Sequence, residues 1–232
     1  MRLNKYLSKC GLGSRRKCDQ LIREGRVRVN HTIVTELSTL VTERDEVRCD
    51  GRMVNPEKTV YILLRKPTGI VTTLHDPQGR RHVGHLIEGL PLVKPVGRLD
   101  MNSSGVLLLT NDGDLHYRLT HPRFQVSKEY VALLDRPLDL QDIRKINAGV
   151  ELDDGAVAHA RVLQYTQKRI ELELREGMYR EVRRLFETLG YRVMELDRIR
   201  FAGLAYAGLK AGDWRHLNPA EVLKLKQLCG LA

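Results

Sequence analysis

Residues 97–114 read GRLDMNSSGVLLLTNDGD, a polar loop that leads directly into an apolar run. The run predicts a buried strand, so we expect the Asp100 carboxylate at the edge of a sheet, where a reacting group gains from fixed positioning. The residues alone leave several roles for Asp100 open: a nucleophile, a base, a metal ligand or an ordinary turn residue. After the strand, Asn111-Asp112-Gly113 is typical of a hairpin turn or of a turn that starts a helix.

Strand patterns continue around this stretch, and helical patterns join them. Apolar or alternating runs predict strands over 60–64, 70–73, 127–134, 160–165, 170–175 and 193–199. Helical periodicity predicts helices over 139–147, 180–189 and 219–228, the last capped by Asn218, with Pro219 and Glu221 in its first turn. Residues 75–85 show neither period and predict a mobile basic loop, either a connector or a substrate contact. This order of elements predicts an α+β fold with a mostly antiparallel or mixed sheet.

The first 54 residues are expected to form a separate, strongly basic domain. Residues 1–30 contain nine Lys or Arg against two acidic residues, and nine minus two accounts for +7 of the net charge of +10. Ser14 predicts a helix over 15–24 that ends at Gly25, and the alternation over 26–29 predicts a strand. Asp50-Gly51 predicts a hairpin between 47–49 and 52–54. Residues 55–59 then predict a linker to a larger domain over 60–232.

A string within this small domain resembles the S-four-type RNA-binding domain. Residues 11–30 read GLGSRRKCDQLIREGRVRVN, a basic helix beside an arginine-studded strand. The resemblance implies RNA binding, and guanidinium groups and helix N-terminal amides suit phosphates and unpaired bases. A solvated basic surface is the alternative. The candidate RNA contacts are Arg15, Arg16, Arg23, Arg26 and Arg28.

Composition excludes several classes of protein. An apolar fraction of 42% is too high for a disordered chain, and the basic excess favours a polyanionic partner, either nucleic acid or an anionic membrane. The apolar runs are too short to span a membrane, and Arg2, Lys5 and Lys9 interrupt any signal peptide, so we expect a soluble cytoplasmic protein. The four cysteines show no C-x-x-C pair and the histidines no H-E-x-x-H helix, so no metal site is expected.

The chain as a whole resembles the pseudouridine synthases, in the branch that acts on ribosomal RNA. The branch signature is G-R-L-D followed by a small residue, a glycine and an apolar run, and every fixed position is met from Gly97 to Thr110. Three further segments agree in order and spacing: RKPTG at 65–69, KEY at 128–130 and EGMYREVRR at 176–184. The resemblance implies an isomerase that works by covalent catalysis without a cofactor.

The resemblance also implies roles for individual residues. Asp100 matches the nucleophile that attacks the target uridine, either at the anomeric carbon or at carbon 6 of the base. Tyr130 matches an aromatic that stacks on the flipped base and can take part in proton transfer, although a core tyrosine is the alternative from the residues alone. Arg183 matches the basic residue that pairs with the aspartate, and Leu196 matches the apolar side chain that packs on the uracil ring.

The helical period of 180–189 supports the position of Arg183 independently. One face carries Val182, Leu185, Phe186 and Leu189. Arg183 lies at the border of that face, from which its guanidinium can reach a carboxylate while its stem packs. Arg180 and Arg184 are predicted to point away, towards RNA phosphates or solvent. Arg98 and Lys66, in the matching segments, complete the candidate substrate contacts.

The resemblance favours large-subunit ribosomal RNA as the substrate. Glu181-Val182-Arg183-Arg184 looks like the large-subunit enzymes of the branch, whereas Tyr179 looks like the small-subunit enzyme. The partners implied are ribosomal RNA or a ribosome-assembly intermediate, and we expect a monomer.

Two other functions stay open at this stage. One is a metal-dependent RNA phosphodiesterase with Asp100, Asp112 and Asp114 as ligands. The pattern over 113–119 argues against it, because it predicts a turn and the start of a helix. The other is a ribosome-binding or assembly protein whose large domain is a passive scaffold. The presence of Asp100 argues against that alternative.

Overall fold

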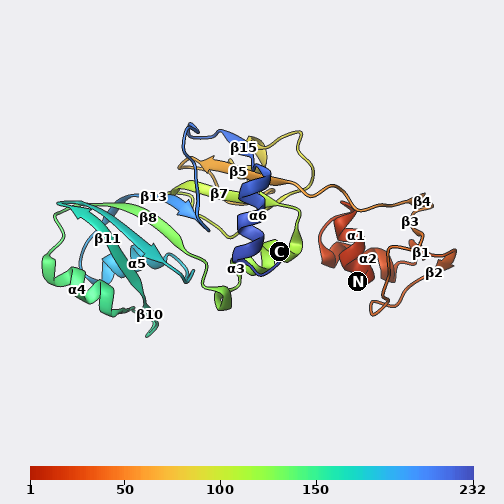
Figure 1. The fold of residues 1–232 in the computed structure, drawn as a ribbon, viewed down its shortest axis with the longest axis horizontal. Coiled ribbons are helices and arrows are strands. Elements are labelled where there is room, and N and C mark those ends of the chain that lie inside the picture. Colours follow the sequence, from red (N-terminus) through yellow and green to blue (C-terminus); the bar gives the residue numbers. More distant parts are fainter. The chain divides into compact units, whose positions relative to one another are not determined.

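The computed structural model describes residues 1–232, which form two compact units (Figure 1). One unit comprises Met1–Val60 with Leu90–Val93, and the other comprises Tyr61–Gly89 with Lys94–Ala232. Each unit has a hydrophobic core of its own. They are described separately below.

The N-terminal unit packs two helices on a small sheet. The helices are α1 (Leu3–Lys9) and α2 (Arg15–Arg23), and the four-stranded sheet has the order β2 (Thr32–Ile33), β1 (Val27–Val29), β3 (Val47–Cys49), β4 (Arg52–Met53). The Ser14 side chain accepts a hydrogen bond from the Lys17 N–H, which confirms it as the cap of α2. Asp50 and Gly51 both have positive φ, at 49° and 77°, as a two-residue hairpin turn requires. The predicted helix and hairpin are therefore confirmed, and α1 is an element that the sequence patterns missed.

A nine-stranded mixed sheet forms the centre of the larger unit. Its main path runs β11 (Ala160–Thr166), β12 (Arg169–Leu174), β8 (Lys128–Leu134), β13 (Val193–Phe201), β7 (Ser104–Thr110), β5 (Tyr61–Lys66), β15 (Trp214–His216). Two short strands join at the side, β6 (Lys94–Pro95) on β7 and β14 (Leu204–Ala205) on β13. Only β13 and β7 run parallel, and the other neighbours are antiparallel. The predicted α+β class with a mostly antiparallel sheet is confirmed.

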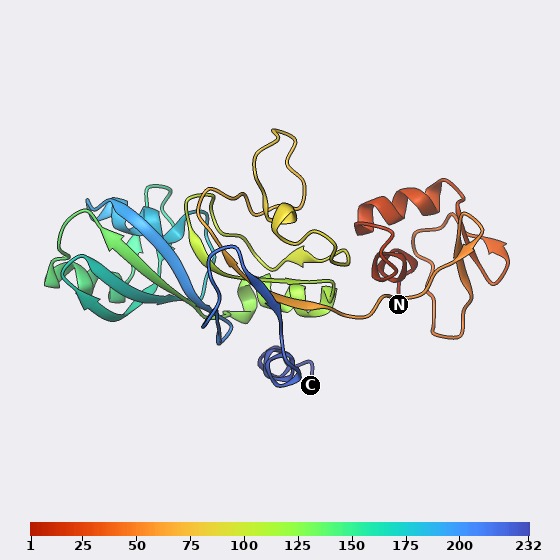
Figure 2. The ribbon, with the colours of Figure 1, turned by 90° about the horizontal axis from the view of Figure 1, so that it is seen from above.

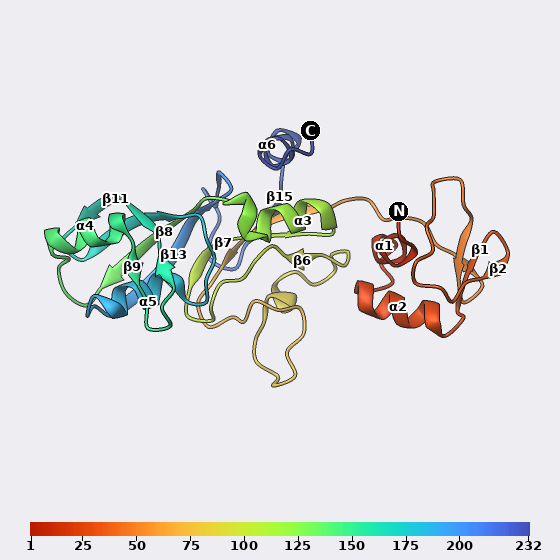
Figure 3. The same ribbon diagram turned by 90° about the horizontal axis from the view of Figure 1, so that it is seen from below.

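Helices cover this sheet in two groups. At the β5–β7 end lie α3 (Gly113–Thr120), which Figure 3 shows beside β6 and β7, and α6 (Pro219–Leu228), and both contribute leucines to one core. At the β8–β12 end, α4 (Leu140–Ala148) and α5 (Glu181–Thr188) contribute to a second core. A short two-stranded sheet, β9 (Val150–Glu151) with β10 (Val157–Ala158), follows α4. The predicted helices over 139–147, 180–189 and 219–228 are confirmed, and Asn218 and Glu221 form a complete capping box.

The segment between β5 and β6 differs from the prediction. Residues 70–73 form no strand, and only one isolated bridge joins Val71 to His82. The Thr72 hydroxyl instead donates to the Leu99 carbonyl, so this segment supports a loop rather than a sheet. Residues 75–85 form the irregular loop that was predicted, closed by an Asp76–Arg80 ion pair and the short 3-10 helix η1 (Val83–Leu86). It extends away from the sheet in Figures 2 and 3.

Candidate active site

The loop that carries Asp100 ends where the central strand β7 begins. Just inside β7, Gly105 has φ 114°, and a Cβ atom at this position would lie 2.3 Å from the Arg198 carbonyl oxygen and 2.6 Å from the Arg198 nitrogen on β13. A side chain does not fit between these parallel strands. The glycine of the signature therefore lets β7 approach β13 closely, directly after the Asp100 loop.

Lys66, at the end of β5, binds the backbone of the Asp100 loop. Its side chain is fully buried, and Nζ donates to the carbonyl oxygens of Asp100 at 3.0 Å and Ser103 at 2.8 Å, with a longer contact of 3.5 Å to Met101. Nζ also donates to the Pro67 carbonyl at 3.0 Å. Burial lowers the pKa of Lys66 to about 8, against the charge of Asp100, which raises it. Lys66 thus fixes the backbone around Asp100.

Three further hydrogen bonds complete the support of the loop. The Gly69 N–H donates to the Met101 carbonyl at 2.8 Å, and the Thr72 hydroxyl donates to the Leu99 carbonyl at 2.6 Å. From α5, Arg183 donates through Nη2 to the Asn102 carbonyl and through Nη1 to the Val193 carbonyl, both at 2.9 Å. Every carbonyl from Leu99 to Ser103 is therefore occupied, whereas no protein group forms a hydrogen bond or ion pair with the Asp100 carboxylate.

A cavity of about 180 Å³ opens in front of this carboxylate. Asp100 shares its wall with Tyr130 on β8 and Leu196 on β13, two residues that the sequence predicted for the site. Arg98 and Arg180 also line the cavity, although Arg180 was predicted to point away. Arg180 occupies a left-handed conformation before α5, with φ 49°, and this turn brings it to the cavity.

The cavity also contains charged residues that the sequence patterns did not single out as site residues. Lys128 donates through Nζ to the carbonyls of Val126 and Glu176, and burial lowers its pKa to about 8. Arg198 is 2% exposed and donates through Nε to the Val106 carbonyl. Glu181 is 6% exposed, and burial raises its pKa to about 7. Lys128 and Glu181 lie within the KEY and EGMYREVRR segments, and this position in the sequence could have indicated both as residues of the site.

The structure shows what three of the predicted basic residues bind, and it corrects the partner predicted for Arg183. Lys66, predicted as a substrate contact, is buried, and its ammonium donates to backbone carbonyls. Arg183 does not form an ion pair with Asp100, because its guanidinium binds the loop carbonyl two residues further on. Arg184 does not line the cavity, and it pairs with the exposed Asp153 and Asp154, each at 2.6 Å. Arg183 is 8% exposed, so its predicted position at the border of the buried face is confirmed.

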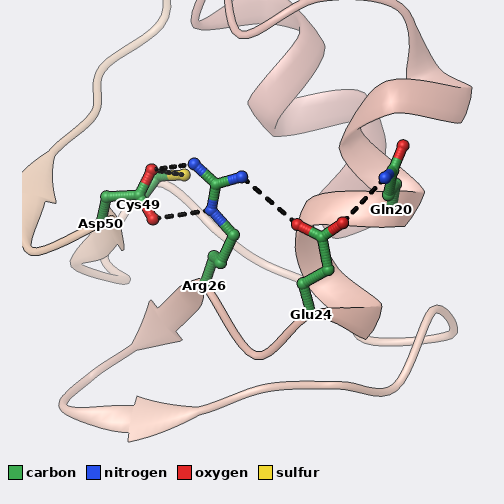
Figure 4. A network of polar contacts seen from close by, with 5 residues as sticks. All are labelled: Gln20, Glu24, Arg26, Cys49 and Asp50. Atoms are coloured by element: carbon green, nitrogen blue, oxygen red, sulfur yellow. Dashed lines mark hydrogen bonds and ion pairs between the residues drawn. The ribbon is translucent and has the colours of Figure 1, made fainter.

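The candidate arginines of the N-terminal unit are exposed but differ in their partners. Arg26 donates to Asp50 through two nitrogens and also contacts Glu24, as Figure 4 shows, and its hydrogen bonds to the Asp50 carboxylate raise the pKa of Arg26. This network ties the hairpin turn to the end of α2. Arg15 donates to Asn4, while no acidic side chain pairs with the remaining three: Arg16, Arg23 and Arg28.

The structure also bears on the metal and membrane alternatives. Asp112 caps α3 by accepting from the Asp114 and Leu115 N–H groups, and it accepts a hydrogen bond from the Tyr61 hydroxyl. Nowhere in residues 1–232 do three His, Cys, Asp or Glu side chains gather as metal ligands would. None of the helices combines the length and apolar character needed to span a bilayer.

Comparison with known proteins agrees with this geometry. Residues 60–188 match the family described as RNA pseudouridylate synthase, and residues 1–47 match the S4 domain. The chain belongs to the RNA pseudouridylate synthase family. The synthase is therefore an RNA-modifying isomerase with an RNA-binding domain, and this membership argues against the phosphodiesterase and passive-scaffold alternatives.

Relatives match the synthase over nearly its whole length. It is 41% identical over 234 residues to the ribosomal large subunit pseudouridine synthase B of Bacillus subtilis (strain 168), covering 98% of this chain and 96% of that one. It is 34% identical over 231 residues to the dual-specificity RNA pseudouridine synthase RluF of Escherichia coli (strain K12), covering 98% and 79%. A crystal structure of a pseudouridylate synthase superposes with a TM-score of 0.71 at 27% identity, over 97% of this chain and 99% of the other.

Proposed function

We propose that the synthase converts a uridine of large-subunit ribosomal RNA into pseudouridine, with the Asp100 carboxylate as nucleophile. The observation that carries this proposal is the contrast within one loop: its backbone is fixed by Lys66 and Arg183, while its carboxylate faces a cavity without a protein partner. Such a carboxylate is positioned and free to react. The name of the Bacillus subtilis relative supports the large subunit as the source of the RNA.

The reaction is an exchange of one glycosidic bond for another. The bond between the ribose anomeric carbon and N1 of uracil breaks, and a bond from the same carbon to C5 forms. C5 loses a proton and N1 gains one, so the reaction needs no oxidant or reductant. A covalent bond to Asp100 between these two steps would keep the detached base in the cavity while it turns.

The cavity wall supports the predicted roles of its other residues. Tyr130 and Leu196 present an aromatic ring and an apolar side chain that suit the two faces of a flipped uracil. Arg98 and Arg180 supply cations for the phosphates beside the target nucleotide. We propose a monomer, because one chain supplies all of these groups. We further propose that it acts in the cytoplasm, on ribosomal RNA or on a ribosome-assembly intermediate.

We predict that Asp100→Asn abolishes pseudouridine formation but changes RNA affinity by only a few-fold. The amide is nearly isosteric with the carboxylate but is a poor nucleophile, and RNA affinity comes mainly from phosphate contacts elsewhere. The measurement is incubation with unmodified ribosomal RNA, followed by carbodiimide treatment and primer extension, together with a binding titration. Turnover of the variant near the wild-type rate would refute the proposed mechanism.

The same assay tests the phosphodiesterase alternative when a chelator is added. We expect wild-type activity to survive excess EDTA as long as the RNA remains folded. Loss of activity that a divalent ion restores by binding to the protein would support the alternative instead.

A further inference from the structure

Unsatisfied polar atoms gather at the active-site cavity. Five buried side-chain atoms in the protein lack a hydrogen-bond partner, and three of them belong to residues that line the cavity: Ser103 Oγ, Glu181 Oε1 and Arg198 Nη2. A buried polar atom without a partner is costly, and most such atoms in native proteins are paired. Their concentration at one cavity indicates that a polar ligand completes them.

Glu181 is the most informative of the three residues. Its Oε2 accepts a hydrogen bond from the Met178 N–H at 3.0 Å, so this oxygen must act as an acceptor. Oε1 has no partner, and the side chain is 6% exposed. The carboxyl therefore has one oxygen committed to the backbone and one available to a ligand.

The surroundings of Glu181 favour its neutral form. No cation forms an ion pair with it, and Lys128, the nearest source of positive charge on β8, is engaged by backbone carbonyls. Burial, together with the charge of Glu176, raises the pKa of Glu181 to about 7, although the hydrogen bond from the Met178 N–H and the charge of Lys128 oppose this rise. The other charged or titratable side chains of the cavity are Arg98, Asp100, His121, Tyr130, Arg175, Arg180 and Arg198.

We propose that Glu181 is a uracil-binding residue whose neutral carboxyl donates a hydrogen bond from Oε1 to a carbonyl oxygen of the target base. A neutral carboxyl has one O–H donor, and the Met178 N–H places it on Oε1 because Oε2 must accept. Uracil offers two carbonyl acceptors on its edge. This inference rests on the proposed function, because it takes uracil to be the group that enters the cavity.

The Met178 N–H also makes glutamine a matched test. In Glu181→Gln the amide oxygen must accept from Met178, so the NH₂ group takes the place of Oε1 and can only donate. Glu181→Gln therefore copies the neutral carboxyl at every pH. Glu181→Met has a similar length and removes the donor.

The experiment is the single-turnover rate of pseudouridine formation between pH 6 and 9 for the wild type and both variants. We expect the wild-type rate to fall as pH rises through about 7, because Glu181 then loses its donor proton. Glu181→Gln should match the wild type within a few-fold at pH 6 and keep its rate up to about pH 8, where Lys66 and Lys128 lose their charges. Glu181→Met should be roughly 10- to 100-fold slower than Glu181→Gln across this range, the cost of one buried hydrogen bond.

Two results would overturn the assignment. One is a Glu181→Gln rate as low as that of Glu181→Met at pH 6, which would mean that the carboxylate acts as an acceptor or base. The other is a decrease of the single-turnover rate near pH 7 that is also seen in Glu181→Gln. If Glu181→Met does not fold, the comparison of pH profiles between wild type and Glu181→Gln still decides. Failure of the proposed function would show differently, as absence of pseudouridine in the wild-type reaction.

Discussion

At the scale of single residues, buried cations act on the backbone of the Asp100 loop rather than on its carboxylate. Lys66 lies on strand β5 and Arg183 on helix α5, and together they bind the carbonyls of residues 100–103. A cation bonded to the backbone fixes the direction of the Asp100 side chain and leaves its oxygens free for the substrate. Both residues are therefore positioning residues.

We predict that Arg183→Met lowers the single-turnover rate by about 100-fold with a much smaller loss of RNA affinity, because a small misplacement of the nucleophile is this costly. Methionine keeps the packing of the stem but removes the donor to Asn102. Arg184→Met is the matched control on the same helix. Its guanidinium contacts only Asp153 and Asp154 at the surface, so its rate should stay within a few-fold of wild type.

Rates and affinities of both variants on one ribosomal RNA fragment provide the measurement. Equal rate losses for the two methionine variants would show that Arg183 does not position the loop. An Arg183→Lys variant keeps the charge but lacks the planar fork that spans the Asn102 and Val193 carbonyls, so an intermediate rate is expected.

At the scale of elements, the contact between β7 and β13 brings the parts of the site together. β7 continues from the Asp100 loop, while β13 carries Leu196 and pairs on its other edge with β8, which carries Tyr130. The register sets Arg198 opposite Gly105 on one side and Tyr130 on the other. The close approach at Gly105 therefore affects both the fold and the geometry of the cavity.

We predict that Gly105→Ala destabilises the protein by roughly 3 kcal/mol or more, since positive-φ strain and overpacking each cost on the order of 1–3 kcal/mol. The new methyl group would collide with the Arg198 backbone. Gly113→Ala is the control, because a Cβ there meets nothing within 4 Å and lies in the first turn of α3. The control should be neutral or stabilise by up to about 1 kcal/mol. The midpoints of urea unfolding measure the stability of both variants. An unchanged midpoint for Gly105→Ala would show that the close approach of β7 to β13 does not require glycine.

At the scale of the whole molecule, the chain forms two compact units. The N-terminal unit has its own core, in which Leu7, Ile22, Val27 and Val47 are fully buried. Its exposed arginines include Arg16, Arg23 and Arg28, which have no acidic partner, whereas the residues proposed for catalysis all lie in the larger unit. We infer that the first unit anchors RNA and the second carries out the isomerisation.

We predict that a chain beginning at Val60 folds, binds its ribosomal RNA target more weakly and keeps its chemistry at saturating enzyme. We expect weaker binding because residues 1–30, with their net charge of +7, are removed. The dependence of log affinity on log salt should flatten by about 0.7–0.9 for each RNA phosphate that the shortened chain no longer neutralises. Salt titrations of both chains provide the measurement. Equal affinity and equal slope would show that residues 1–54 are not the RNA anchor.

Features that arise from local interactions can be predicted from the amino-acid sequence. Ser14 and Asn218 cap helices through neighbouring N–H groups, and the 3.6-residue period of α5 placed Arg183 at the border of a buried face. The signature residues around Asp100 predicted a reactive loop before a strand. Caps, periods and turns depend on residues a few positions apart, so they can be read from the chain alone.

The partners of the long cationic side chains depend instead on tertiary packing. Lys66 reaches a carbonyl 37 positions away and Arg183 one 81 positions away, while Arg184, the next residue, turns to Asp153 and Asp154. The same holds for residues 70–73, whose apolar pattern fits a strand but which support the Asp100 loop instead. A flexible cationic side chain has no period or spacing that selects its partner. Its partner is set by the packing of β5, β7, α5 and β13. This packing buries each cation where the carbonyls of the Asp100 loop are the acceptors within reach.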